Sequence, residues 1–104
     1  MVYEVILSSQ AKTHFRKIID YLLYELENRQ AAISVADDFD DTVARLSHMA
    51  GSLKLCDDRV LQAKGYRTIH FRRHRYLMVY TVDGDRANVE GIYHELQDYE
   101  GILG

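Results

Sequence analysis

The segment from Lys64 to Tyr76 holds the densest group of residues whose types could do chemistry. Its cations are Lys64, Arg67, Arg72, Arg73 and Arg75, and the aromatic residues among them are Tyr66, Phe71 and Tyr76. Such cations neutralise phosphates and such rings stack on bases, as in many nucleic-acid-binding surfaces. The same charges also protect a solvated hairpin from pairing with another sheet edge, so this pattern alone leaves both interpretations open.

The histidines and aspartates of the sequence could in principle bind a metal ion, but their pattern is a weaker signal than the basic segment. His70 and His74 could share one strand face, but zinc needs a third and a fourth ligand, and the arginines between the two histidines would repel the ion. The acidic run 37–41 has helical offsets that point its carboxylates in different directions, so we expect a solvated helix face there. We predict no metal site.

Motifs for cofactors and for secretion are missing from the sequence. It contains no glycine-rich phosphate loop, no His-Glu-x-x-His and no cysteine pair. Cys56 is the only cysteine, which excludes an internal disulfide and makes a reducing compartment the simplest assumption. The N-terminus lacks the features of a signal peptide, and no apolar run approaches the roughly 18 residues of a membrane span. We expect a cytoplasmic protein that binds no cofactor and no membrane.

The elements that must position these residues begin with a strand and two amphipathic helices. Val2 to Leu7 is rich in β-branched and aromatic residues, which predicts a strand. Apolar residues then recur at spacings of three and four from Ala11 to Leu26 and from Ala32 to Met49, which predicts two helices. Asn28 ends the first helix or caps the second. The two helices would form a hairpin.

The second half of the chain predicts strands. Ala50-Gly51-Ser52 breaks the second helix, and the aperiodic stretch 53–61 predicts a loop that holds Leu53, Leu55 and Val60 against the core. Apolar patterning then predicts strands over 66–71, 76–82 and 87–94, with a hairpin turn at Asp83-Gly84-Asp85. Residues 1–104 thus predict one α+β domain in the order β-α-α-β-β-β, an antiparallel sheet packed against an N-terminal helical hairpin.

The charge is unevenly distributed along the chain. The formal net charge is -3, whereas nucleic-acid-binding domains usually carry a basic excess. Residues 1–62 hold seven basic and ten acidic residues, residues 83–104 hold one and six, and residues 64–75 hold five basic residues and no acid. One basic segment therefore lies in an acidic protein.

Several fragments occur in a familiar order and spacing. They are Tyr3-x-Val5-x-Leu7-Ser8-x-x-Ala11, Ile18-x-x-Tyr21-Leu22, Gly65-Tyr66-Arg67, Tyr76-Leu77-Met78-Val79-Tyr80-Thr81-Val82 and Ile92-Tyr93-His94-x-x-x-Asp98-Tyr99. In this arrangement the chain resembles the RelE/ParE toxin superfamily, and within it the ParE-like plasmid-stabilisation branch. The resemblance implies a toxin encoded with an antitoxin, whose flexible C-terminal segment wraps the toxin and blocks its active surface.

Two targets occur in that superfamily. RelE-like members cut mRNA on the ribosome with basic side chains in place of a metal, and ParE-like members poison DNA gyrase. As a nuclease, this chain would use Arg67, Tyr93 and His94. However, Leu77 follows Tyr76 and Glu95 follows His94, two places where RelE-like nucleases carry basic residues. The resemblance therefore favours the ParE-like branch, although that branch usually has a proline after the second helix and an arginine at Gln97.

The resulting hypothesis is a ParE-like, non-enzymatic gyrase poison that a cognate antitoxin neutralises. The residues predicted to bind the target are Lys64, Arg67, Arg72, Arg73, Arg75, His94 and Tyr99. The residues predicted to border the antitoxin are Tyr21, Leu23 and Tyr24, although the two tyrosines flank the apolar stripe and are expected at the edge of the core. For His94 we favour a structural hydrogen bond to Asp98 or a backbone carbonyl over proton transfer. The alternatives are a RelE-like ribosome-dependent mRNA endonuclease and a non-toxic module that binds an antitoxin or forms a homodimer.

Overall fold

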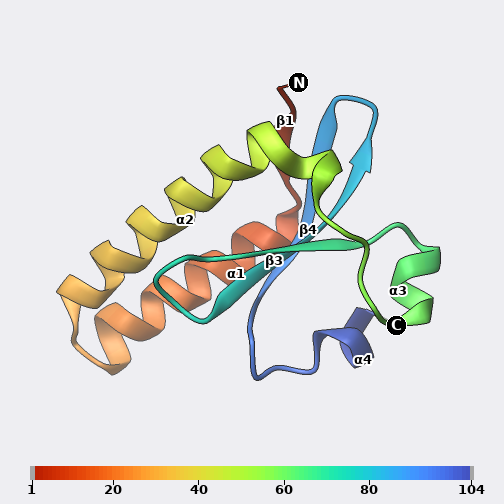
Figure 1. Ribbon diagram of the computed structural model, residues 1–104. Coiled ribbons are helices and arrows are strands. Elements are labelled where there is room, and N and C mark those ends of the chain that lie inside the picture. Colours follow the sequence, from red (N-terminus) through yellow and green to blue (C-terminus); the bar gives the residue numbers. More distant parts are fainter. Residues whose placement is uncertain (1, 104) are drawn as a thin grey trace.

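The computed structural model describes residues 2–103, in which a four-stranded sheet packs against a helical hairpin (Figure 1). The strands are β1 (Glu4–Leu7), β2 (Arg67–His70), β3 (Tyr76–Asp83) and β4 (Arg86–His94). The helical elements are α1 (Ser9–Asp20), the π-helical turn η1 (Tyr21–Glu25), α2 (Arg29–Met49), the 3-10 turn η2 (Ala50–Ser52), α3 (Arg59–Ala63) and α4 (Tyr99–Leu103). No helix within residues 2–103 has the length and apolar character needed to cross a bilayer.

Side-chain caps start both long helices. The Ser8 hydroxyl accepts the backbone N–H of Ala11 at 3.0 Å, and the Asn28 side chain accepts that of Ala31 at 3.0 Å. Each cap satisfies an N–H group that the first helical turn leaves without a partner. Asn28 thus caps the second helix, and the predicted helical hairpin is confirmed.

The end of the first helix differs from the prediction. The periodic pattern continues to Leu26, but the regular helix ends at Asp20, and the N–H of Leu26 bonds to the carbonyl of Tyr21, five residues back, at 3.0 Å. Such a π-type turn has more residues than an α-turn, so the side chains that follow lose the phase of the apolar stripe. Glu27, with φ of 47°, then reverses the chain toward α2.

The sheet has the order β1-β4-β3-β2 and is mixed. β2 with β3 and β3 with β4 are antiparallel, as short connections predict, but β1 pairs parallel to β4, from Glu4 opposite Arg86 to Leu7 opposite Val89. The expectation of a wholly antiparallel sheet is therefore wrong for one pair. Short turns fix only the last three strands, whereas the long helical crossover returns the chain in a direction that allows parallel pairing.

The sheet is buried on both faces, which explains why the inner strand β3 is almost wholly apolar. The face toward α1 and α2 buries Met78 and Tyr80, and the Tyr80 hydroxyl donates to the carbonyl of Ala50 at 2.7 Å. The opposite face buries Leu77, Val79 and Tyr93 beneath side chains of α4. The strand pattern of the sequence agrees with β3, and α4 adds a cover that the sequence did not predict.

The stretch predicted as a loop over 53–61 contains the start of the short helix α3. Asp58 caps this helix by accepting the N–H groups of Val60 and Leu61, each at 3.0 Å. The helical turn buries Leu61 completely and leaves Val60 half exposed, so the expectation that Val60 packs on the core is wrong. The N-cap at Asp58 fixes where α3 begins and therefore which of its residues face the core. The apolar residues of this stretch show no clean period, so the sequence did not predict the helix.

Replacing Leu46 with alanine is expected to lower the free energy of unfolding by about 3 kcal/mol, since the side chain is fully buried against the sheet and its loss leaves a cavity. Urea denaturation measures the change. Val60→Ala is the matched control, because Val60 is half exposed and its truncation should cost less than about 0.5 kcal/mol. Equal losses for the two variants would contradict this description of the core.

Candidate target-binding surface

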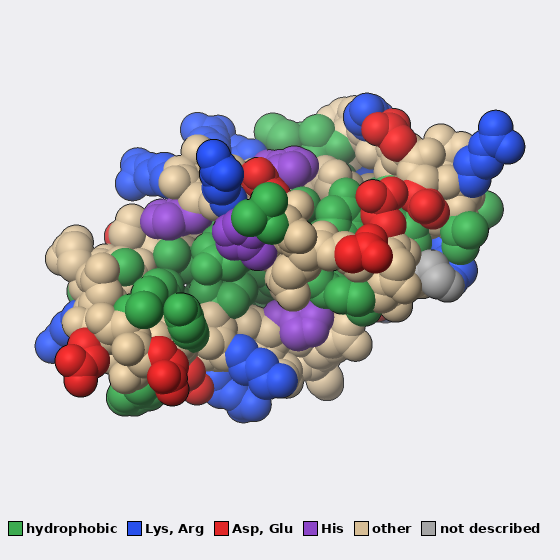
Figure 2. Space-filling view, turned by 90° about the horizontal axis from the view of Figure 1, so that it is seen from below, with side chains coloured by type: hydrophobic (Ala, Val, Ile, Leu, Met, Phe, Trp, Pro, Cys, Tyr) green, Lys and Arg blue, Asp and Glu red, His purple; other side chains and the backbone are tan. Residues whose placement is uncertain are grey.

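An arginine loop, which we define as residues 71–75, connects β2 to β3. Arg72, Arg73 and Arg75 are exposed there, whereas Phe71 is buried at 5% exposure and anchors the start of the loop in the core. Figure 2 shows one face of the molecule, on which a group of basic side chains lies near histidines along one edge and further basic side chains are spread over the rest of the face. Three exposed guanidinium groups within four residues can bind carboxylates or phosphates through paired hydrogen bonds.

Two other predicted target-binding cations do not join the arginine loop. Arg67 is half-buried in β2 and donates to the carbonyl of Leu53. Lys64 is exposed at the end of α3, where its ammonium group lies 3.3 Å from the carbonyl of Leu103. Figure 1 shows α3 and the arginine loop at opposite ends of β2. The basic segment of the sequence is thus split between two places.

A buried carboxylate on α2 holds the arginine loop. Asp38, whose side chain is 1% exposed, accepts the backbone N–H groups of Arg72 at 3.2 Å and Arg73 at 2.9 Å, and it lies 2.8 Å from Nδ1 of His74. An ionised carboxylate only accepts, so Nδ1 carries the proton. Nε2 of His74 lies 3.4 Å from the hydroxyl of Ser34. Asp38 was predicted to face solvent, and that prediction is wrong.

Other residues on the same face of α2 extend this support. At spacings of four, three and four, the face carries Ser34, Asp38, Asp41 and Arg45. The Asp41 carboxylate bonds to Arg45 at 3.1 Å and lies 3.4 Å from Arg72 Nε, and Arg45 donates to the carbonyl of His70 at 2.8 Å. Helical spacing places these groups together on α2. Only the folded loop, however, covers Asp38 and supplies its hydrogen-bond donors.

The environment of Asp38 lowers the pKa of its carboxyl. Burial acts to raise this pKa, but hydrogen bonds from His74 and from the backbone N–H groups of Arg73 and Arg72 outweigh burial and hold the pKa below the ordinary value of 3.8. A group with a lowered folded pKa stabilises the protein above its unfolded pKa. This stabilisation is lost as the pH falls through the folded pKa.

Asp38→Asn is therefore expected to destabilise the protein by about 2 kcal/mol at pH 6 and by less at pH 3, because the carboxyl of unfolded wild type protonates below its ordinary pKa of 3.8 and the advantage of aspartate then begins to fall. Urea denaturation of both proteins at the two pH values measures this. The comparison cancels the titration of Asp37 and Asp41, which both proteins share. A destabilisation of the same size at both values would contradict the role of the ionised carboxylate.

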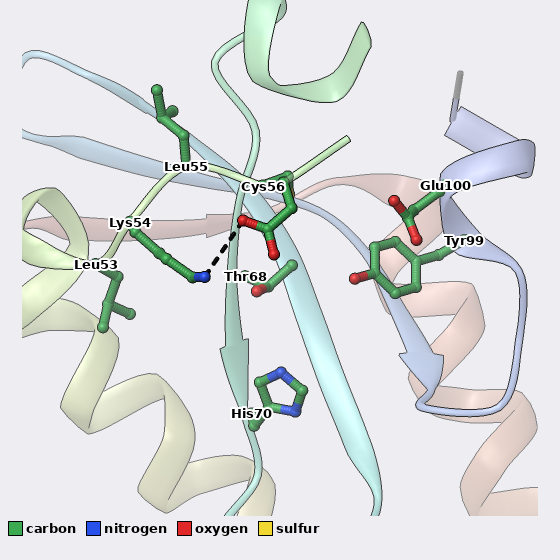
Figure 3. Close-up of a pocket in the computed structure, with 9 residues that line it drawn as sticks. Leu53, Lys54, Leu55, Cys56, Thr68, His70, Tyr99 and Glu100 are labelled. Carbon is green, nitrogen blue, oxygen red and sulfur yellow. Dashed lines mark hydrogen bonds and ion pairs between the residues drawn. The ribbon is translucent and has the colours of Figure 1, made fainter. Parts of the chain in front are cut away.

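A cleft of about 430 Å³, which we name the sheet cleft, lies on the face of β2 opposite to the helical hairpin. Its lining residues are Leu53, Lys54, Leu55, Cys56, Asp57, Thr68, His70, Tyr99 and Glu100. Figure 3 shows Lys54, Thr68, His70 and Tyr99 pointing into one space from the segment before α3, from β2 and from α4. Of these, the sequence singled out Tyr99 for binding. Strand alternation, which puts Thr68 and His70 on the face opposite buried Ile69, is the signal that could have found two more.

The basic groups of the sheet cleft face carboxylates. The ammonium of Lys54 lies 3.3 Å from Asp57, and Nδ1 of His70 lies 3.3 Å from Glu95. Burial, followed by the nearby carboxylates of Glu100 and Asp57, raises the pKa of the Cys56 thiol, so this cysteine is a poor nucleophile. Among residues 2–103, no three His, Cys, Asp or Glu side chains cluster as metal ligands.

The three residues named for a nuclease all have structural partners. Tyr93 is 3% exposed and its hydroxyl accepts the side-chain N–H of Gln10 at 3.2 Å, while burial raises its pKa. Nδ1 of His94 accepts the N–H of Leu96 at 3.1 Å, and Arg67 is bound as described above. The hydrogen bond expected from His94 to Asp98 or to a backbone carbonyl is wrong in its partner, because the ring accepts the backbone N–H of Leu96.

The tip of the helical hairpin presents apolar side chains to solvent. Tyr21 is 50% exposed and Tyr24 is 74% exposed, so their expected place at the edge of the core is wrong, and the π-helical turn accounts for it. Beside them a shallow groove of about 360 Å³ opens between α1 and α2. This hairpin groove is lined by Phe15, Ile19, Leu23, Arg29, Ala32, Ile33 and Ala36. Of the residues predicted to meet an antitoxin, Leu23 lies in it.

Comparison with known proteins agrees with this architecture. The family described as the ParE toxin of the type II toxin-antitoxin system, parDE, matches residues 5–99. A chain of a chromosomal ParDE toxin-antitoxin system from P. aeruginosa superimposes with a TM-score of 0.72 at 18% identity, covering 89% of this chain and 96% of the other. A chain of the RelBE2 toxin-antitoxin complex from Mycobacterium tuberculosis superimposes with a TM-score of 0.56 at 17% identity, covering 90% and 99%. No curated protein matches. Because the family match spans most of the sequence, the chain belongs to the ParE toxin family of type II toxin-antitoxin systems.

Proposed function

We propose that this toxin poisons DNA gyrase in the cytoplasm, that a cognate antitoxin neutralises it, and that the pair serves plasmid stabilisation. The observation that carries the proposal is the arginine loop, whose exposed guanidinium groups stand on a support of buried hydrogen bonds. A poison needs only to bind and hold an intermediate of its target. A rigid cationic loop suits that task, because little flexibility is lost on binding.

The net charge of -3 is compatible with this mode of binding. At physiological ionic strength charges are screened beyond about 8 Å, so a loop in contact with an anionic surface acts through its own arginines. Long-range attraction to a polyanion such as ribosomal RNA would instead depend on the charge of the whole protein. The distribution therefore favours a specific contact over capture by a nucleic acid at large.

The contents of the sheet cleft weigh against the mRNA nuclease. Cleavage without a metal requires unpaired cations that stabilise charge on the phosphate and a group that activates the 2′-hydroxyl. Here the Glu95 carboxylate lies beside His70, Lys54 faces Asp57, and Arg67 is bound to a backbone carbonyl. A binding role fits this set of side chains better than phosphoryl transfer.

The hairpin groove is the surface that we propose for the antitoxin. It is apolar and shallow, and Ile33 is 46% exposed on its rim. A groove of this kind fits the apolar side of a helix, which would cover it through side chains at helical spacing. The chromosomal ParDE and RelBE2 chains that share the fold come from toxin-antitoxin systems, which supports an antitoxin as the partner.

Expression without the antitoxin gene tests the proposal in cells. We expect growth to stop with an early fall in thymidine incorporation and a later fall in methionine incorporation, because blocked gyrase stops DNA synthesis first. The opposite order would favour the mRNA nuclease. Continued growth with soluble toxin present would favour a module that only binds its antitoxin or dimerises.

A further inference from the structure

We infer that Asp38 is a positioning residue that holds the arginine loop in the one shape its target recognises. The inference rests on the proposed function, in which this loop binds the target. Neither the resemblance to known toxins nor the pattern of the sequence pointed to Asp38. Its position within the folded protein does, because the carboxylate joins α2 to three consecutive residues of the loop.

The contacts of Asp38 concentrate on the loop backbone. The two oxygens of the carboxylate receive the N–H groups of Arg72 and Arg73 separately, and His74 adds a third donor at 2.8 Å. Consecutive N–H groups that converge on one anion fix the backbone dihedrals between them. The side chains of Arg72 and Arg73 extend from this fixed backbone toward solvent. Asp38 therefore sets the positions from which these two side chains reach outward.

A carboxylate is an unusual choice if stability is the only purpose. Burying an ionised group costs solvation energy, and this cost is offset only because several donors converge on the carboxylate. A buried carboxylate does, however, specify a single arrangement of its donors. The conformation of the arginine loop is therefore the property that Asp38 controls most directly.

The three side chains of Ser34, His74 and Asp38 follow the order of a nucleophile, a base and an orienting acid in a hydrolytic site. The Ser34 hydroxyl lies 3.4 Å from His74, at the limit of a hydrogen bond. Ser34 is inside the regular helix α2, where backbone N–H groups bond to carbonyls four residues earlier and cannot stabilise an oxyanion. The geometry suits positioning better than acyl transfer.

The test compares full-length wild type with Asp38→Asn and with Asp40→Asn, an exposed aspartate on the same helix. Amide hydrogen exchange measures how well the backbone of the loop is ordered. The toxin concentration that halves gyrase supercoiling measures how well the loop binds its target. For Asp38→Asn we expect the Arg72 and Arg73 amides to exchange at least about tenfold faster and the inhibitory concentration to rise at least about tenfold, because the freed loop must be ordered on binding. Asp40→Asn should match wild type.

Substitutions of His74 provide a second route that leaves the carboxylate in place. The amide of His74→Asn can donate in place of Nδ1, so this variant should keep most of the inhibition, whereas His74→Phe offers no donor and should resemble Asp38→Asn. Affinity for the purified antitoxin should stay within about twofold in all four variants, which shows that each is folded. If His74→Phe inhibited gyrase as strongly as His74→Asn, this result would count against Asp38 as the group that holds the loop.

The outcomes separate this inference from the proposed function. If wild type inhibits gyrase and Asp38→Asn inhibits it equally, or if the Arg72 and Arg73 amides stay protected in Asp38→Asn, the inference is overturned while the function stands. If wild type leaves gyrase untouched, the function fails. Growth arrest by Asp38→Asn relative to wild type then decides the inference: weaker arrest supports it, and equal arrest overturns it.

Discussion

Reversing the charge of the arginine loop, by Arg72→Glu, Arg73→Glu and Arg75→Glu together, is expected to abolish growth arrest and to raise the inhibitory concentration on gyrase at least about a hundredfold. Even a modest contact of about 1 kcal/mol for each arginine gives a loss of this size. All three side chains are exposed, so the fold and the affinity for the antitoxin should be retained. Supercoiling assays and antitoxin titrations measure the two properties on one preparation.

A matched variant removes the effect of net charge. Lys12→Glu, Arg59→Glu and Arg86→Glu change three exposed cations elsewhere by the same total charge. We expect this variant to inhibit gyrase within about threefold of wild type, since screening confines exposed charges to short range. If the triple loop variant remains toxic while folded, the arginine loop has no part in the mechanism. If both variants lose activity equally, net charge rather than the loop is responsible.

Placing glutamate at two positions of the hairpin groove, by Leu23→Glu and Ile33→Glu, is expected to weaken antitoxin binding at least about a hundredfold. Burial of each aliphatic side chain is worth about 1.5–3 kcal/mol, and a charge in its place would lose its water on binding. Inhibition of gyrase should persist, because none of the residues that line the groove belongs to the arginine loop. The expected result in cells is a toxin that coexpressed antitoxin no longer neutralises.

Calorimetric titration with the purified antitoxin measures this loss. Val60→Glu serves as the control, because Val60 is also a half-exposed apolar residue but belongs to α3. An unchanged affinity for the double variant would move the antitoxin to another surface, such as the outer edge of β1. A loss of gyrase inhibition together with antitoxin binding would indicate a damaged fold instead of a damaged groove.

Local sequence signals predict the elements that short-range physics controls. Apolar spacing and the cap at Asn28 locate the long helices, and the turn at Gly84, with φ of 61°, locates the β3–β4 hairpin. The parallel pairing of β1 lies beyond such signals, because it depends on where a long crossover returns the chain. Strand order at that edge is therefore known only once the fold is known.

The functional surface is predictable in part. Three neighbouring arginines mark a cationic loop, and the structure keeps them exposed. Arg67 lies in the same basic segment, yet strand pairing places it beside a backbone carbonyl. Asp38 lies within a run of aspartates that reads as solvated, and only the tertiary contact with the loop buries it. Contacts between residues distant in the sequence, 14 positions for Arg67 with Leu53 and 34 to 36 positions for Asp38 with the loop, are what the sequence pattern leaves open.

A DNA-cleavage assay with purified gyrase distinguishes a gyrase poison from an mRNA nuclease. Purified toxin is added to gyrase, relaxed plasmid and ATP, and DNA broken in both strands is quantified after the enzyme is denatured. We expect supercoiling to fall and linear DNA to accumulate as toxin is added, and we expect prior addition of antitoxin to prevent both. Unchanged supercoiling at excess toxin, with ribosome-bound mRNA cut in a parallel reaction, would contradict it.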